Sequence, residues 1–371
     1  MRVLVLNAGS SSLKAQYIEV GGDVLFDVTV ERIGEGGDAP EDHTAAVGTL
    51  LERFDGDLAR PDAVGHRVVH GGPDMVRPTL LDEDAIAAIE GLIPLAPLHN
   101  PANLAGIRAA REAFDDLPHV AVFDTAFHAT LPPAAHRYAV PHDWHDEHGV
   151  RRFGFHGISH EYVARRAAEL LGRDAEDLRM VTAHLGNGQS VCAVDGGRSV
   201  DTSMGFGPLA GLVMGTRSGD IDPTVVQYLV DQVGMDLDDV FHNLNKQSGL
   251  RALAGSNDLR DVEAAAEDGD TDARLALDVM VHRLVGYVAA YAVRMGRLDA
   301  LVFTAGIGEH SALIRRRVCE GLGLLGVTLD GDANEAVGGD ARIDAGEGPA
   351  VLVVPTDEEG EIARQVAELV G

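Results

Sequence analysis

The stretch Val3-Leu4-Val5-Leu6-Asn7-Ala8-Gly9-Ser10-Ser11-Ser12-Leu13-Lys14 decides how this chain folds. Residues 3–6 are apolar, as in a buried strand, and residues 13–20 form a second, alternating strand-like run. The turn between them is small and polar, so its backbone N–H groups can approach an anion closely. An ordinary hairpin with a solvated serine turn has the same pattern. The stretch therefore predicts a strand–turn–strand unit, either plain or phosphate-binding.

A second hairpin of the same kind lies in the other half of the chain. Residues 181–183 are apolar and lead through His184 into a turn at 185–190, and residues 191–194 return. The Asn-Gly pair in this turn is a strong hairpin signal. The recurrence hints at internal duplication. Two related domains that each direct such a hairpin into a shared cleft would hold a nucleotide.

Length and charge limit the classes of function. A chain of 371 residues favours two domains, and its net charge of −29 argues against nucleic acid and membrane surfaces as partners. Two cysteines are too few for a disulfide framework and indicate a reducing compartment. The first residues lack the pattern of a signal peptide, and no apolar run is long enough to cross a membrane. We expect a cytoplasmic protein that draws in anionic substrates through local Arg and His.

Strand-like and helical patterns alternate along the chain. Apolar runs that resemble buried strands are residues 3–6, 63–69, 120–123, 180–184, 300–304 and 350–354. Helical spacing is found at residues 164–171, 277–292 and 359–370, and the acidic segment 330–348 is expected to be an exposed connection. This alternation predicts an α/β fold. The periodicity breaks over residues 124–150, and we predict domains at 1–125 plus 360–371 and at 126–359.

Two arginines are candidates for anion binding. Arg67 lies in a strand pattern just before a Gly-Gly turn, and Arg217 lies in an open loop with flanking Gly and Ser. The planar guanidinium fork suits carboxylate and phosphate oxygens, so the pair suggests a clamp on a small, doubly charged anion. A strand arginine can also be a salt-bridging edge residue.

The histidines gather in loop-like segments. His156 and His160 have the spacing of a metal-binding pair, but no glutamate follows the first histidine and no third ligand is evident. The more specific hypothesis is that one of these histidines stabilises the charge of a phosphoryl group during its transfer. A hydrogen-bonded core histidine is the plain alternative.

Carboxylates follow two of the predicted strands. Asp124 ends one strand, where α/β folds place their clefts, and Glu358 and Glu359 follow the last strand, where one of them can bind Mg²⁺. Helix capping and helix-dipole effects explain acids at such positions equally well. Gly306-Ile307-Gly308 between a strand and a helix is a weak nucleotide signal on its own.

Taken together, these segments resemble the acetokinase family over nearly the whole chain. The matching motifs are LNAGSSSLK, GHRVVHGG, APLHNP, FDTAFH, RRFGFHGISH, HLGNGQS, DTSMGFGPLAG, MGTRSGDIDP, NKQSGL, FTAGIGEHS and PTDEE. The resemblance implies a two-domain sugar-kinase/Hsp70/actin-type fold with duplicated ribonuclease-H-like domains and an interdomain active-site cleft. It also implies reversible phosphoryl transfer from ATP to acetate, giving ADP and acetyl phosphate, with Mg²⁺ or its substitute Mn²⁺.

The resemblance implies a role for each matching residue. The metal site is assigned to Asn7 and Glu358, and the catalytic residues are Arg67, Asp124, His156 and Arg217. The pocket for the acetate methyl group is assigned to Val69, Leu98, Phe155 and Pro208, beside Arg67. Nucleotide binding is assigned to Lys14, His184, Leu185, Gly186, Asn187, Gly188, Asp258, Leu259, Arg260, Gly306, Ile307, Gly308 and His310. A carboxylate nucleophile is already ionised near neutral pH, so Asp124 is expected to orient the reacting groups and not to act as a base.

Several positions depart from the family pattern. Ala305 and His310 differ from the usual Gly and Asn beside the adenosine site, and Gln16, Ile158, Gly207 and Ala210 also differ. None of these removes a proposed catalytic group. They leave nucleotide preference and acyl preference open, so a propionate kinase or another short-chain acyl kinase remains an alternative. A zinc-dependent hydrolase and a non-catalytic nucleotide-binding regulator are alternatives of other classes. A homodimer is what the resemblance implies.

Overall fold

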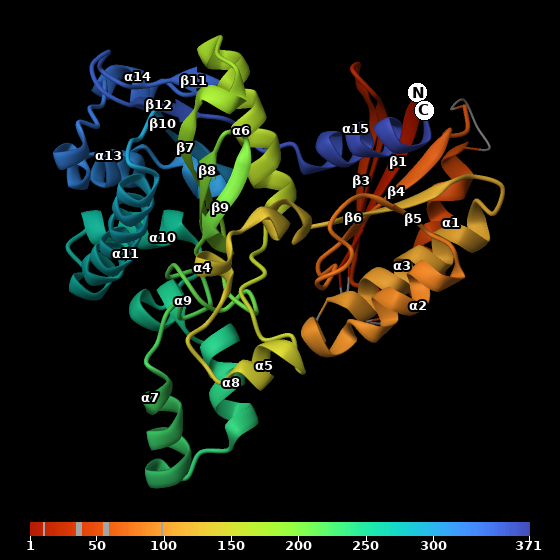
Figure 1. The fold of residues 1–371 in the computed structure, drawn as a ribbon, viewed down its shortest axis with the longest axis horizontal. Coiled ribbons are helices and arrows are strands. Elements are labelled where there is room, and N and C mark those ends of the chain that lie inside the picture. The colour runs from red at the N-terminus through yellow and green to blue at the C-terminus, as the bar shows by residue number, and fades with distance from the viewer. Residues whose placement is uncertain (10–11, 35–38, 55–58, 98) are drawn as a thin grey trace. The chain divides into compact units, whose positions relative to one another are not determined.

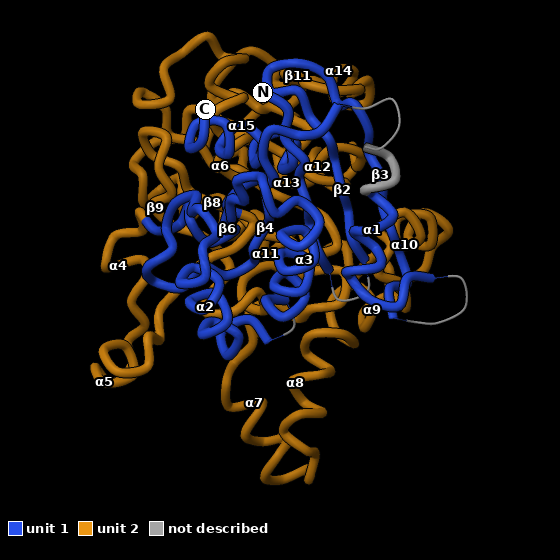
Figure 2. The backbone as a smooth tube through the Cα atoms, turned by 90° about the vertical axis from the view of Figure 1, so that its right-hand side faces the viewer, with its two compact units in different colours: residues 1–129, 157–159, 357–371 blue, residues 130–156, 160–356 orange. Residues whose placement is uncertain are grey.

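The computed structural model describes residues 1–9, 12–34, 39–54, 59–97 and 99–371 (Figure 1). The chain forms two compact units, drawn in different colours in Figure 2. Unit 1 comprises residues 1–129, 157–159 and 357–371, and unit 2 comprises residues 130–156 and 160–356. The domain boundaries given above stay a prediction.

Unit 1 is built on a six-stranded mixed sheet in the order β3-β2-β1-β4-β6-β5. Its strands are β1 (Arg2–Ala8), β2 (Ser12–Glu19), β3 (Val24–Glu31), β4 (Ala63–Val68), β5 (Thr79–Leu80) and β6 (His119–Phe123). Strands β1, β2 and β3 form an antiparallel meander, whereas β4 and β6 run parallel to β1. The carboxyl ends of β1, β4 and β6 therefore meet at one edge of the sheet.

Alternation along β1 gives the sheet of unit 1 two apolar faces. Leu4, Leu6 and Ala8 pack against helices α1 (His43–Phe54) and α3 (Asn100–Ala113), whereas Val3 and Val5 pack against α15 (Glu358–Val370). Helix α2 (Glu83–Gly91) packs against α3. Burial on both faces explains why the strand reads as a continuous apolar run.

Unit 2 repeats this topology. Its strands are β7 (Arg179–Leu185), β8 (Gln189–Asp195), β9 (Arg198–Thr202), β10 (Ala300–Thr304), β11 (Ala341–Arg342) and β12 (Ala350–Val353). Strands β7, β8 and β9 form the meander, β10 and β12 run parallel to β7, and the order β9-β8-β7-β10-β12-β11 matches that of unit 1 position by position. The duplication suggested by the two hairpins is therefore present in the strand order, and the predicted α/β class is confirmed.

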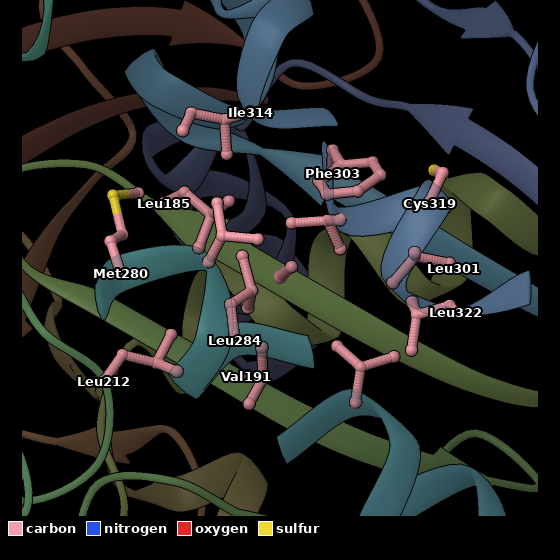
Figure 3. Close-up of a cluster of buried hydrophobic side chains, with 14 of the residues drawn as sticks. Leu185, Val191, Leu212, Met280, Leu284, Leu301, Phe303, Ile314, Cys319 and Leu322 are labelled. Atoms are coloured by element: carbon pink, nitrogen blue, oxygen red, sulfur yellow. The ribbon is translucent and has the colours of Figure 1, made fainter. Parts of the chain in front are cut away.

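Helices cover both faces of the second sheet. The helices from residue 133 to residue 335 are α4 (Pro133–His136), α5 (His142–Asp146), α6 (Gly157–Leu171), α7 (Pro223–Tyr228), α8 (Leu237–Lys246), α9 (Gly249–Ala254), α10 (Leu259–Glu267), α11 (Thr271–Met295), α12 (Ala305–His310), α13 (Ala312–Gly321) and α14 (Gly331–Glu335), and α5, α7 and α8 lie away from the sheet (Figure 1). Residues of β7, β8 and β10 pack against α11 and α13 in the main core, where Leu284, Phe303 and Ile314 converge (Figure 3). Helix α6 lies on the opposite side of the sheet from α11 (Figure 1).

Helix α11 is long and apolar enough to cross a membrane by length and composition alone. Its buried residues, including Leu277, Met280 and Val288, belong to the core of unit 2. Its apolar character is therefore explained by packing inside a globular unit. Gly296 ends the helix in a left-handed conformation.

The expectation that residues 330–348 form an exposed connection is wrong in part. The segment contains α14 and the edge strand β11, and Asn334 and Ile343 are fully buried. Asn334 accepts a hydrogen bond from the buried Arg315 side chain (2.7 Å), which fixes this segment to α13. Exposed acidic residues such as Asp332 and Glu335 surround these anchors and hide them in the sequence pattern.

Candidate active site

Three parallel strands bring the first group of predicted residues together in unit 1. Asn7 lies on β1, Arg67 on β4, and Asp124 directly follows β6, at the edge where the carboxyl ends meet. Arg67 donates to Asp124 through two N–H groups, one of them Nε (3.2 Å to Oδ1), and through Nη1 to Asn7 Oδ1 (3.3 Å). Arg67 Nε also lies 3.6 Å from Glu358 Oε2. Four of the predicted residues therefore share one site.

Burial sets the electrostatics of this group. Burial and the nearby Glu358 charge raise the pKa of Asp124 to about 6, against the opposing effect of Arg67. Burial lowers the pKa of Arg67, but the charges of Asp124 and Glu358 more than offset this and keep the guanidinium protonated. The edge of the guanidinium that carries Nε is already occupied by Asp124.

The donors around Arg67 fit a magnesium ion by their chemistry. Asn7 offers an amide oxygen and Glu358 a carboxylate, and Mg²⁺ in kinases uses one or two such protein ligands together with phosphates and water. The described residues contain no group of three or more His, Cys, Asp or Glu arranged around a metal.

The loop after β4 is fixed by residues that the sequence analysis did not single out. Val69 N donates to Asn103 Oδ1 (3.1 Å), His70 N to Asn100 Oδ1 (3.3 Å) and Gly71 N to Thr125 Oγ1 (3.1 Å). The two asparagines lie one turn apart on α3. Their only sequence signal is the HNPAN pattern, which resembles an ordinary helix start.

Lys14 lies on β2 in unit 1. Its ammonium group pairs with Glu359 Oε1 at 2.8 Å. Burial lowers the pKa of Lys14, but the Glu359 hydrogen bond and charge more than offset this effect and raise it. Its predicted contact with a nucleotide stays a prediction.

Unit 2 holds the second group, centred on His156. This residue has a left-handed backbone (φ 58°), and its ring stacks on His184 with centroids 4.2 Å apart. His156 Nδ1 lies 2.9 Å from Ser190 Oγ, and the same hydroxyl lies 2.8 Å from His160 Nε2. Ser190 therefore connects the two histidines, a role that the sequence analysis missed.

The metal-pair interpretation of His156 and His160 finds no support in this geometry. His160 is fully buried, with Nδ1 at 2.7 Å from Thr182 Oγ1 and Nε2 on Ser190. Both ring nitrogens are engaged by hydroxyl groups inside the protein. His160 is thus a hydrogen-bonded core histidine that supports His156.

Arg217 faces the same spot from the loop after β9. A Cβ atom added to Gly188 would lie 3.4 Å from His156 Nε2 and 3.6 Å from Arg217 Nη1. Arg217 Nη1 donates to Pro208 O (3.2 Å) and lies near Met214 Sδ, and among the described residues no carboxylate pairs with it. Burial lowers its pKa. A partly buried guanidinium without a counter-ion, beside an imidazole and a glycine, is suited to bind an anion.

A cavity of about 370 Å³ adjoins this group in unit 2. Predicted nucleotide residues on its wall are Gly186, Asn187, Asp258, Leu259, Arg260, Gly306, Ile307 and His310, and residues that the sequence analysis missed are Asn257, Glu263 and Ser311. The volume lies in the range of small-molecule sites. Leu185 and Gly308 are not on the cavity wall: Leu185 is buried in the apolar core, and Gly308 is buried beside Phe303.

Ala305 occupies a strained position at the end of β10. Its φ of 62° lies in the left-handed region that favours glycine, and it is almost fully buried. A Cβ atom added to Gly186, which lines the cavity, would lie 3.9 Å from the Ala305 methyl group. Ala305 therefore lies close to the cavity wall. The departure from glycine noted in the sequence therefore has a local conformational cost.

The predicted acyl pocket is divided between the units. Val69 belongs to unit 1, and Phe155 and Pro208 belong to unit 2. Val69 and Phe155 are buried, and Pro208 is half-buried. Leu98 lies outside the described residues. The shared pocket stays a prediction.

Known proteins resemble this chain over its full length. A sequence model of the acetokinase family matches residues 2–364. An acetate kinase from Leifsonia xyli subsp. xyli is 53% identical over 99% of this chain and 98% of its own length. The crystal structure of acetate kinase from Porphyromonas gingivalis superposes with a TM-score of 0.95 at 41% identity and 100% coverage of both chains. A propionate kinase from Francisella tularensis superposes with a TM-score of 0.93 at 40% identity and 98% coverage of both chains.

These likenesses confirm the predicted fold of the sugar-kinase and actin type, with its duplicated sheets. The range of the family model includes every motif on which the resemblance was based. The chain belongs to the acetokinase family.

Proposed function

We propose that this protein is an acetate kinase that transfers the γ-phosphoryl group of ATP reversibly to acetate. One acetate oxygen forms a bond to phosphorus while the bond from phosphorus to the bridging oxygen of ADP breaks, so acetyl phosphate and ADP leave. The observation that carries the proposal is the convergence of His156, Arg217 and Gly188 beside the cavity in unit 2. Phosphoryl transfer requires positioning and charge neutralisation more than covalent chemistry, and this arrangement supplies both.

Each charged residue has a proposed part. Arg217 and His156 stabilise the charge on the phosphoryl oxygens as they pass between donor and acceptor. Arg67, with its Nε edge held by Asp124, binds the substrate anion through its remaining N–H groups. Asp124 orients that guanidinium, because acetate is ionised already and needs no base.

The nucleotide is proposed to bind in the cavity with its phosphates toward the hairpin tip at Asn187 and Gly188. Mg²⁺, or Mn²⁺ in its place, is proposed to be held by Asn7 and Glu358, whose oxygen donors suit both ions. The metal would neutralise phosphate charge when bound. The remaining proposed nucleotide contacts are Lys14 and His184.

The acyl group is proposed to be acetate, with propionate as the second candidate because one similar structure is a propionate kinase. Val69, Leu98, Phe155 and Pro208 carry no charge that could bind a polar tail. Apolar pockets discriminate one methylene by only about 1–3 kcal/mol. We therefore expect measurable propionate activity and poor butyrate activity.

The protein is proposed to act in the cytoplasm as a homodimer on small molecules, without nucleic acid or membrane partners. The net charge of −29 supports the exclusion of polyanions. Exposed apolar side chains on and between α7 and α8 support a protein interface; they are Val225, Tyr228, Val233, Leu237 and Phe241. Sedimentation equilibrium of the purified chain tests the dimer.

The activity is tested by trapping acyl phosphates with hydroxylamine in reactions that contain ATP, Mg²⁺ and formate, acetate, propionate or butyrate. We expect the highest kcat/KM with acetate and none without ATP. A higher value with propionate would favour the second candidate. Absence of acyl phosphate with every acid would overturn the proposed function.

A further inference from the structure

The side-chain amide of Asn187, at the tip of the hairpin between β7 and β8, has its oxygen enclosed by two neighbours. Asn187 Oδ1 accepts a hydrogen bond from Asn257 Nδ2 at 3.3 Å, and both residues line the cavity of unit 2. The same oxygen lies against the backbone of Gly215, where an added Cβ atom would overlap with it. The position of this oxygen therefore depends on a donor at residue 257 and on the missing side chain at residue 215.

The neighbour at residue 215 determines which end of the amide is the oxygen. Gly215 presents a Cα–H group, which makes a weak favourable contact with an oxygen. An NH2 group turned to the same place would direct its hydrogens at that Cα–H group, with no acceptor for them. The amide nitrogen of Asn187, on the other arm of the fork, donates to none of the residues that the structure describes. It remains available for a ligand.

The backbone of Gly215 is fixed on both sides. Its N–H group donates to the Asn187 carbonyl oxygen (3.0 Å), and its own carbonyl oxygen accepts from Arg251 N in α9 (3.0 Å). The preceding carbonyl oxygen, of Met214, accepts from Leu250 N (2.9 Å). These bonds tie the loop to the hairpin and to α9. A methyl group added at Gly215 is therefore expected to displace the Asn187 side chain and not the loop.

The loop that contains Gly215 also carries Arg217. Arg217 Nη1 and His156 Nε2 both lie close to Gly188, the next residue after Asn187 in the hairpin tip. These two groups are proposed above to meet phosphoryl oxygens. An amide oxygen beside them would repel a phosphate, whereas an amide N–H group donates to it. The observed orientation of Asn187 thus adds a donor to this group.

We propose that Gly215 and Asn257 are positioning residues that act through Asn187: they hold its side-chain oxygen away from the ligand, so that its NH2 group binds the phosphates of the nucleotide. The inference rests on the proposed nucleotide site and concerns how that site recognises phosphate. Gly215 acts by leaving room for the oxygen, and Asn257 by donating a hydrogen bond to it. Loss of this orientation should weaken ADP binding and leave adenosine binding unchanged, because adenosine has no phosphate.

The first test places a methyl group where the oxygen lies. Gly215→Ala should lower the affinity for ADP, measured by calorimetry with Mg²⁺ present, by about tenfold or more, the usual effect of losing a hydrogen bond to a charged group. Affinity for adenosine should stay that of the wild type. Gly215 has a φ outside the left-handed region, so alanine is not strained there. Gly286→Ala on α11, where a Cβ atom would meet nothing within 4 Å, is the matched control and should bind both ligands normally.

A double-mutant cycle tests whether Gly215 acts through Asn187. Asn187→Ala should weaken ADP binding to a similar extent, and adding Gly215→Ala to it should cause no further loss, because the methyl group then has room. A further loss of the same size in the double variant would overturn the inference. Equal losses of ADP and adenosine affinity in Gly215→Ala would also overturn it, as would wild-type ADP affinity in Asn187→Ala.

Asn257→Ala tests the orientation without a change at Gly215. It should lower ADP affinity by about 2–10-fold, the usual effect of losing a neutral hydrogen bond, and this loss should disappear in the Asn187→Ala background. A loss that persists there would mean that Asn257 contacts the ligand itself, and it would overturn the positioning role, as would wild-type ADP affinity in Asn257→Ala. The expected binding results without acyl phosphate formation from any acid would overturn the proposed function and support this inference.

Discussion

Arg67 and Arg217 carry the same charge in different surroundings. Arg67 is held by Asp124 and lies near Glu358, whereas among the described residues Arg217 has only neutral acceptors. Removal of a paired guanidinium leaves a buried carboxylate without its partner, whereas removal of an unpaired guanidinium does not. Their variants therefore separate a contribution to catalysis from a contribution to folding.

We expect Arg67→Ala and Arg217→Ala each to lower kcat/KM by at least about 10²–10³-fold, the usual effect of losing a group that stabilises transition-state charge. Only Arg67→Ala should also destabilise the fold, by about 3–5 kcal/mol, because it leaves Asp124 buried without its partner. Lysine should rescue either position poorly, since a point charge does not replace a fork.

Steady-state kinetics and chemical denaturation of the same variants provide the measurement. Arg108→Ala, which removes an exposed pair with Glu90 on the helical face, serves as control and should change neither property. Near-normal kcat/KM in Arg217→Ala would remove that residue from the mechanism. Equal destabilisation by both alanine variants would contradict the difference in pairing.

At Ala305 we expect a replacement by glycine to stabilise the protein, whereas such a replacement in a helix usually destabilises it. Replacing alanine by glycine inside a helix costs about 1 kcal/mol, as expected for Ala264→Gly at an exposed position of α10. At Ala305 the left-handed backbone strains any side chain, so Ala305→Gly should raise the free energy of unfolding by about 0.5–1 kcal/mol. Urea denaturation of both variants compares the signs directly. Destabilisation in both would show that the methyl contacts near Gly186 outweigh the strain.

At the scale of elements, two buried histidines link neighbouring strands of unit 1. His66 Nε2 of β4 lies 3.0 Å from His119 Nδ1 of β6, and His119 Nε2 lies 3.0 Å from the Phe114 carbonyl. A carbonyl only accepts, so His119 donates to it and accepts from His66. Burial lowers the pKa of both rings, with Arg111 adding to the effect. Both are neutral in the folded protein.

This pairing predicts that unit 1 loses stability in mild acid. In the unfolded chain a histidine has a pKa near 6.5. Below this pH the unfolded chain binds protons that the two buried rings of the folded protein do not bind. The free energy of unfolding then falls by up to about 1.4 kcal/mol per pH unit for each histidine, until the pH reaches the lowered folded pKa values. Chemical denaturation at pH 7.5 and at pH 5.5 measures this change. The free energy of unfolding should fall less between the two pH values in His119→Gln than in the wild type. His242→Gln, at an exposed site on α8, should keep the wild-type fall, and an unchanged fall in His119→Gln would contradict the assignment.

The elements were predictable from sequence where one local pattern determined them. Strands such as β1 and β10 are buried on both faces, so continuous apolar runs revealed them. Glu263, Ser311 and Asn103 were not predictable, because each looks like a helix surface or cap residue until the fold brings it to a loop or a cavity. Ser190 connects His156 and His160 across more than one element, and no spacing in the chain encodes that contact.

At the scale of the whole molecule, the net negative charge is expected to have the largest electrostatic effect on stability. A net charge of −29 with only two lysines, Lys14 and Lys246, gives strong self-repulsion in the folded state. Salt screens this repulsion, with a Debye length that falls from about 30 Å at 0.01 M to about 3 Å at 1 M. We expect Tm to rise by several degrees over this range, even though salt also weakens exposed pairs such as Arg60–Asp116. Thermal unfolding in NaCl at pH 7.5 measures the rise, and a smaller rise at pH 5, where net charge is lower, is the control. A Tm that falls with salt would show that ion pairs outweigh the net charge.

Helix α15 covers one face of the sheet in unit 1, although unit 2 lies between them in the chain. During synthesis on the ribosome, Val3 and Val5 leave the exit tunnel long before Ile362 and Val366 exist to cover them. At about 5–20 residues per second, this apolar face waits for tens of seconds. We therefore expect the nascent sheet to need protection by a chaperone, whereas all residues of unit 2 precede α15 in the chain.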